Sequence, residues 1–241
     1  MEPGLSPKLL KAAAVCALFS AVTTLAVHLL PWLWADLDTF QERLALPHNS
    51  LYMGRLWIVL VHCVLVVVSM FGVAALKFRD SPGLIGLGFL SFVVFALAEW
   101  LRTSLALFAL NRKWRVDYSA EKDDAVRASV RATIDAFAGV SDALFFIFYA
   151  AFLLGIVCYG FALIGSRGFD GKVGWLFLLW SALNLPVLID TFTGREYFGA
   201  FFEWVGPFFQ PVARVIIGLW LWSKSNMLAA VITNHRDRSA T

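Results

Sequence analysis

Charged side chains are scarce in this sequence. They make up 15% of its 241 residues, whereas about a quarter of a soluble domain is charged. Hydrophobic residues make up 60% of the chain, and its ten Trp and 22 Phe supply more aromatic surface than one soluble core needs. The shortage of charge therefore argues against an ordinary soluble protein and predicts a polytopic membrane protein, with the lipid bilayer as its surroundings.

The signatures of several function classes are also missing. The net charge is only +3, and the basic residues are spread over many loops, so we expect no nucleic-acid partner. Cys16, Cys63 and Cys158 each lie inside an apolar segment, which is not the pattern of a disulfide framework or a CxxC metal site. There is no GxSxG, HExxH or glycine-rich phosphate loop. The motifs therefore identify no particular reaction and no cofactor, and they leave open whether the protein is an enzyme.

Long apolar segments predict an all-α bundle of six transmembrane helices in a single domain over residues 1–241. The spans are expected at about 9–34, 55–77, 84–111, 137–164, 173–190 and 205–223. The first span has no small-x-small cleavage pattern, so we interpret it as a retained helix and not as a signal peptide. From Ser119 to Gly139 the chain is polar and free of Pro, which predicts that span four extends beyond the membrane as a helix.

An even number of spans puts both termini on the same side of the membrane. Short basic loops carry the orientation signal, and the loops on the terminal side, around Lys77 and Lys172, are short and mainly basic. This pattern predicts cytoplasmic termini in a cell membrane. The aromatic-rich loop 191–204 is expected at the membrane interface or folded back over the bundle.

Polar side chains within the spans gather in one half of the membrane. Consecutive helices alternate in direction, so all these positions fall in the half away from the termini. The residues are His28, His62, Glu99, Arg102, Asp142, Asn184, Asp190, Gln210 and Arg214. An isolated charge in hydrocarbon costs roughly 3 kcal/mol, so these side chains must face protein or water. The sequence therefore predicts a polar cavity in one half of the bundle and a dry seam in the other.

The first interpretation of this cluster is a binding or transport site. The guanidinium groups of Arg102 and Arg214 match a carboxylate or phosphate, which predicts a small polar, anionic or amphipathic ligand or a lipid headgroup. In this interpretation Glu99 and Asp142 tune the charge of the cavity or carry a proton.

Two alternatives remain open. His28 and His62, on neighbouring helices at similar depth, are candidate ligands of a haem or metal ion, with Glu99 or Asp142 as a third ligand. In the other alternative the charges only pair with one another and fix helix register, and the polar helix near 120–136 docks a partner as part of a scaffold. The sequence predicts no oligomeric state.

The sixth span reads PFFQPVARVIIGLWL over residues 207–221. It resembles a bacterial family of multi-pass integral-membrane proteins of unknown function, and the stretches His62–Leu76 and Asp142–Gly160 are similar in style. The resemblance implies a bacterial inner-membrane protein and assigns no catalytic residue.

Overall fold

The structure, a computed structural model, describes residues 6–33, 39–193 and 199–238, and over these residues it contains helices and no strand. The six long helices are α1 (Pro7–Leu29), α3 (Ser50–Lys77), α4 (Pro82–Ser104), α6 (Asp124–Ile164), α7 (Phe169–Thr193) and α8 (Gly199–Arg238). Within the described part of the chain, six helical segments are long and apolar enough to cross a membrane. The predicted all-α six-helix class is therefore confirmed.

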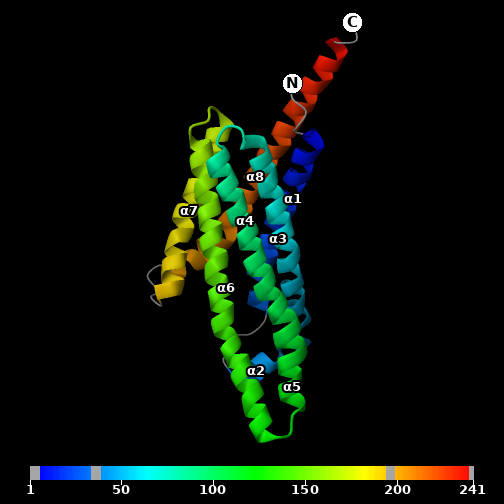
Figure 1. The fold of residues 1–241 in the computed structure, drawn as a ribbon, viewed down its shortest axis with the longest axis vertical. Helices are drawn as coiled ribbons and strands as arrows, with labels where there is room; N and C mark the ends of the chain where they lie inside the picture. Colours follow the sequence, from blue (N-terminus) through cyan, green and yellow to red (C-terminus); the bar gives the residue numbers. More distant parts are fainter. Residues whose placement is uncertain (1–5, 34–38, 194–198, 239–241) are drawn as a thin grey trace.

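The long helices form a closed ring in chain order. Each packs against its neighbours in sequence, and α1 closes the ring by packing along α8. Short connections keep consecutive helices adjacent in space. Both termini lie at one end of the bundle, and the short helices α2 (Phe40–Ala45) and α5 (Arg115–Ala120) lie at the opposite end (Figure 1). We call these the terminal end and the hairpin end.

The third span continues further than the sequence predicted. It was expected to end at residue 111, but α4 runs without a break into a π-helix, η3 (Leu105–Trp114), and then into α5. Asn111 supports this path, because its side-chain amide donates to the carbonyl of Ala106 at 2.6 Å and its oxygen accepts from Arg115. The helix therefore continues past the predicted end of the third span, since these side-chain bonds support the helical path of the polar stretch.

A tight turn joins α5 to α6 at the hairpin end. The carboxylate of Glu121 accepts from the backbone N–H groups of Lys122 and Asp123, which lowers the pKa of Glu121. Asp123 caps α6 by accepting from the backbone N–H groups of Ala125 and Val126. As predicted, the fourth long helix begins in polar sequence well before its apolar stretch.

Other boundaries also differ from the apolar pattern. The predicted polar loop 36–55 contains α2, where Thr39 and Glu42 form a capping box, and the short 3₁₀ turn η2 (Leu46–His48). Helix α8 extends past residue 223 to Arg238, and the expected loop 191–204 is partly helical, because α7 ends at Thr193 and α8 begins at Gly199. The placement of the aromatic side chains of 197–204 lies outside the described residues.

The half of the bundle toward the terminal end is densely packed. Its largest fully buried side chains include Trp180, Trp220, Tyr159, Phe92 and Phe177. The hydroxyl of Tyr159 donates to the carbonyl of Met70 at 3.0 Å, so this polar group is satisfied inside the apolar core.

Candidate functional site

A cavity of about 300 Å³ lies between α1, α3, α4, α6 and α8. Its volume is at the lower end of the range for small-molecule sites, roughly 300–1,000 Å³. Eight polar side chains line it: Thr24, His28, Arg55, His62, Glu99, Arg102, Gln210 and Arg214. The structure therefore brings together six of the nine residues that the sequence singled out, from four different helices.

The opposite wall of the cavity is aromatic. It is formed by one residue of α4 and one face of α6: Phe95, Phe145, Phe148, Tyr149 and Phe152. The α6 residues recur at the three- and four-residue spacing of a single helix face. Arg102 lies against the aromatic wall at Phe145, whereas Arg55 and Arg214 come from α3 and α8, so the cavity can accommodate a molecule with one charged and one apolar part.

Glu99 and Arg102 form a closed pair within α4. The Nε of Arg102 donates to Glu99 Oε2 at 2.8 Å, and its Nη2 donates to Oε1. Glu99 is 4% exposed and also accepts from the hydroxyl of Thr103 at 3.4 Å. The guanidinium lies over the ring of Phe145, 5.5 Å from its centroid. Both oxygens of the Glu99 carboxylate therefore accept from the Arg102 guanidinium. The two opposite charges neutralise each other and hold both side chains in place at the edge of the cavity.

Arg214 is placed very differently. It is 2% exposed, and its polar contact is an Nη1 bond of 3.4 Å to the hydroxyl of Ser20 on α1. Its guanidinium lies 5.3 Å from the ring centroid of Trp180, while its buried Nε has no hydrogen-bond partner. No carboxylate of the described residues is within ion-pair distance of Arg214. A buried cation of this kind retains donors for an anion.

Two further basic groups face the same space from α3. The Nε of Arg55 donates to the carbonyl of Val27 at 2.9 Å, which anchors the side chain to the end of α1. The Nδ1 of His62 lies 2.8 Å from the hydroxyl of Thr23. The site predicted from the sequence did not include Arg55. Its spacing of seven residues from His62 was the available signal, because residues seven apart lie on one face of a helix.

Three of the predicted site residues lie outside this cavity. Asp142 is exposed and lines a separate cavity at the hairpin end. Asn184 lies one layer behind the aromatic wall, where its Oδ1 accepts from the hydroxyl of Tyr149 at 2.8 Å. Asp190, near the end of α7, is not among the residues that line the central cavity. Asp142 shares the α6 face of Phe145 and Tyr149 but lies one turn nearer the hairpin end, whereas Asn184 and Asp190 are on α7, which contributes none of its described residues to the lining of the central cavity.

Two histidines line the cavity, but the described residues around them do not complete a metal site. His28 and His62 both line the cavity, but no group of three His, Cys, Asp or Glu side chains with metal-binding geometry occurs in the described part of the chain. Of the expected third ligands, Glu99 is held by Arg102 and Asp142 lines a different cavity. The donor set therefore lacks a third ligand near the histidine pair.

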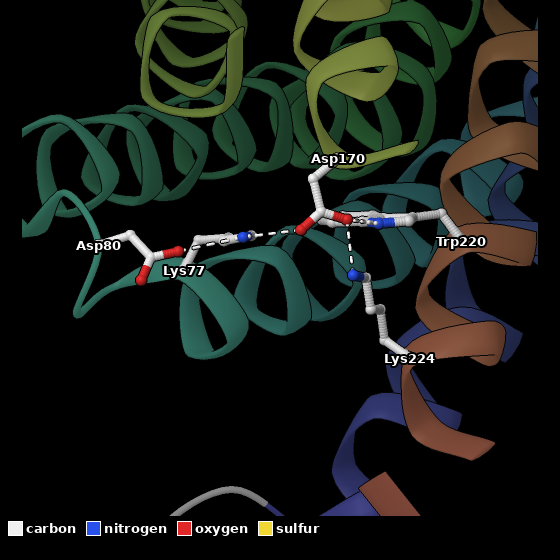
Figure 2. Close-up of polar contacts among 5 residues, drawn as sticks. All are labelled: Lys77, Asp80, Asp170, Trp220 and Lys224. Atoms are coloured by element: carbon white, nitrogen blue, oxygen red, sulfur yellow. Dashed lines mark hydrogen bonds and ion pairs between the residues drawn. The ribbon is translucent and has the colours of Figure 1, made fainter. Parts of the chain in front are cut away.

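A second buried charge cluster, absent from the predicted site, lies toward the terminal end. Asp170, in the first turn of α7, accepts from Lys77 at 2.8 Å, from Lys224 at 2.7 Å and from the indole N–H of Trp220 at 3.0 Å (Figure 2). Lys77 also pairs with Asp80 at 3.0 Å. Asp170 and Lys224 lie just outside the spans predicted from the sequence, at 173–190 and 205–223. No spacing signal connects residues so far apart in the chain.

Comparison of the chain with protein families, with curated proteins and with solved structures finds no match. The resemblance of span six to a bacterial membrane-protein family therefore stays a prediction, and the site is interpreted from its geometry.

Proposed function

We propose that this multi-pass membrane protein binds a small amphipathic anion in the central cavity and carries it within the membrane. The ligand would be a carboxylate or phosphate attached to an apolar group. The observation that supports this proposal is Arg214, a buried guanidinium that lines the cavity without a carboxylate partner among the described residues. Burial of an unpaired cation is costly, and a bound anion would offset that cost.

The proposed binding mode follows from the two walls. Arg214 and Arg55 would hold the anionic group, with Gln210 as a neutral hydrogen-bonding neighbour. The apolar part of the ligand would lie against Phe148 and Phe152, where it replaces water next to aromatic surface. Arg102 was an equal candidate from the sequence, but its bond to Glu99 makes Arg214 the stronger anion ligand.

The proposed setting is a bacterial inner membrane with cytoplasmic termini. It rests on the short basic loops of the terminal side and on the resemblance of the sixth span. The cavity residues lie toward the opposite ends of their helices, so the site would occupy the outer half of the bilayer.

The test is binding of matched short-chain probes to the purified protein in mild detergent. Hexanoate and hexyl phosphate should raise the apparent melting temperature in a concentration-dependent manner, and hexylammonium, of the same chain length, should not. In Arg214→Gln the apparent affinity for hexanoate should fall roughly ten- to a hundredfold, because a hydrogen bond to a charged group contributes about 1.5–3 kcal/mol. Native mass spectrometry of the same samples distinguishes a free anion from a lipid headgroup, since a bound lipid would appear as an adduct that Arg214→Gln loses.

Arg112→Gln is the matched control. Arg112 lies in η3 on an exposed position and contacts the ring of Phe108 outside the cavities. The control should bind hexanoate as the unsubstituted protein does. Equal hexanoate affinity in Arg214→Gln, or equal binding of hexylammonium, would contradict the proposal.

A further inference from the structure

Two further cavities follow the central cavity toward the hairpin end. A middle cavity of about 170 Å³ shares Arg55, Val59 and Arg102 with the central cavity. An outer cavity of about 340 Å³ shares Leu110, Phe137 and Ser141 with the middle one. Because neighbouring cavities share lining side chains, the three lie in a row from the membrane interior to the hairpin end.

Arginines line every stage of this series. Arg43 on α2 and Arg115 on α5 line the outer cavity, Arg55 and Arg102 line the middle one, and Arg214 lines the innermost. Arg43 is exposed, whereas Arg115 is 7% exposed and donates to a neutral amide oxygen of Asn111. An anion that moved inward would therefore find at least one guanidinium group in the lining of each cavity.

The carboxylates along the series are fewer and mostly paired. Glu99 is bound by Arg102. Asp135, in the outer cavity, lies 3.7 Å from Arg131. Asp142 is the third carboxylate among the lining residues. Five arginines against three carboxylates leave the route positive, which favours anions over cations.

The backbone at the middle of the route is unusual. Ala106 and Leu110 line the middle cavity and belong to the π-helix η3. A π-helical segment widens the helix and is frequently found at functional sites. In this chain it shapes the wall between the outer and central cavities.

The other end of the central cavity is closed by packing. On α8, Ile217, Trp220 and Leu221 follow Arg214 toward the terminal end and are at most 2% exposed. On α1, Ala17 is equally buried. The structure thus has solvent-sized space leading from Arg214 toward the hairpin end and a dry core in the other direction.

We propose that an aqueous, anion-selective path leads from the hairpin end through the outer and middle cavities to Arg214, with Arg43 and Arg115 as the first docking position. Its role as the route of the ligand rests on the proposed function. The path itself is a separate claim, and the test below uses no ligand.

The experiment measures thiol modification in single-cysteine variants. Cys16, Cys63 and Cys158 are first replaced by alanine. Leu44→Cys then reports on the outer cavity and Val59→Cys on the boundary of the middle and central cavities. Each is treated with a negatively charged (sulfonatoethyl) or a positively charged (trimethylammonioethyl) methanethiosulfonate. The cysteine thiolate forms a disulfide with the reagent, and methanesulfinate leaves.

We expect both positions to react, and the anionic reagent to modify Val59→Cys at least about tenfold faster than the cationic one. Ala106→Trp, which fills the middle cavity, should slow the modification of the introduced cysteine when it is added to Val59→Cys. When it is added to Leu44→Cys, the rate of modification should not change. Ala109→Trp adds equal bulk at a residue that does not line the cavities, so it should affect neither position.

The opposite results overturn the path. They are failure of Val59→Cys to react, equal or faster reaction with the cationic reagent, or no effect of Ala106→Trp. If hexanoate fails to bind while the labelling pattern is found, the proposed function is wrong and the path stands. If hexanoate binds while Val59→Cys is unreactive, the site stands and its ligand arrives by another route.

Discussion

At the scale of single residues, Asp170 and Arg214 show two different uses of a buried charge. Asp170 accepts from two lysines and an indole, so its charge is compensated within the protein. Arg214 has one long bond to a hydroxyl and an aromatic ring beside it. A fully paired buried charge positions helices, whereas an incompletely paired one retains interactions for a ligand. We therefore assign a structural role to Asp170 and a binding role to Arg214.

Replacing Asp170 with Asn should destabilise the protein. The substitution leaves Lys77 and Lys224 close together without their shared anion, and breaking one side of a buried pair costs about 3 kcal/mol. The apparent melting temperature in detergent should fall clearly below that of the unsubstituted protein.

Asp80→Asn is the control for this prediction. Asp80 also pairs with Lys77, but its side chain is 59% exposed, and exposed pairs contribute about 0–1 kcal/mol. If both variants melt at the same temperature, the cluster around Asp170 does not hold α3, α7 and α8 together.

At the scale of elements, α1 packs closely against both of its neighbours in the ring. It lies between α3 and α8, and it presents the small buried residues Ala13, Ala14 and Ala17. Gly72 on α3 and Gly218 on α8 face it from the two sides. Small residues let the helix axes approach, which is how helices associate inside a membrane.

Gly72→Ala should weaken the contact between α1 and α3. A Cβ at Gly72 would overlap the Cβ of Ala13, so a backbone must shift, and overpacking of this kind costs about 1–3 kcal/mol. Thermal unfolding in detergent measures the loss.

Gly54→Ala, in the same helix, gives the matched comparison. Its Cβ would meet nothing within 4 Å, and alanine is favoured over glycine in a helix by about 1 kcal/mol. The control should be neutral or slightly stabilising. A stable Gly72→Ala variant would show that α1 and α3 can separate without cost.

At the scale of the whole molecule, the ring has two unlike halves. The terminal half is closed by large aromatic side chains and tied by Asp170, while the half toward the hairpin end contains the neighbouring cavities. Both termini lie at the closed end (Figure 1). Loops on that side are short and basic, which predicts that the closed end faces the cytoplasm.

This orientation can be measured with epitopes at both termini and in the turn at residues 121–123. In spheroplasts, from which the outer membrane barrier has been removed, the turn epitope should be accessible to antibody, and the terminal epitopes should become accessible only after the inner membrane is permeabilised. Accessible termini and a protected turn would reverse the orientation. Termini on opposite sides would mean that one of the six helices does not span the membrane.

The sequence by itself determined the number of spans and the depth of the polar residues along them. A transmembrane span can be identified from its own apolar composition, without knowledge of the helices that pack against it. Because consecutive spans run in opposite directions, the position of a residue along its span gives its depth in the membrane. The exposed extension of the fourth span was also predictable, because helix-forming residues continue through its polar stretch.

Only the tertiary structure decided which of those polar groups share a cavity. Arg55 lines the central cavity because the packing of α3 turns it inward. Asn184 and Asp190 lie outside it because α7 contributes none of its described residues to the lining, and Asp142 lines the outer cavity, one turn of α6 nearer the hairpin end. The packing of α3, α7 and α8 likewise brings Asp170 to Lys77 and Lys224, which are far from it in the sequence. The depth of a residue in the membrane follows from its position along the helix. The side toward which its side chain points depends on how the helix packs against its neighbours.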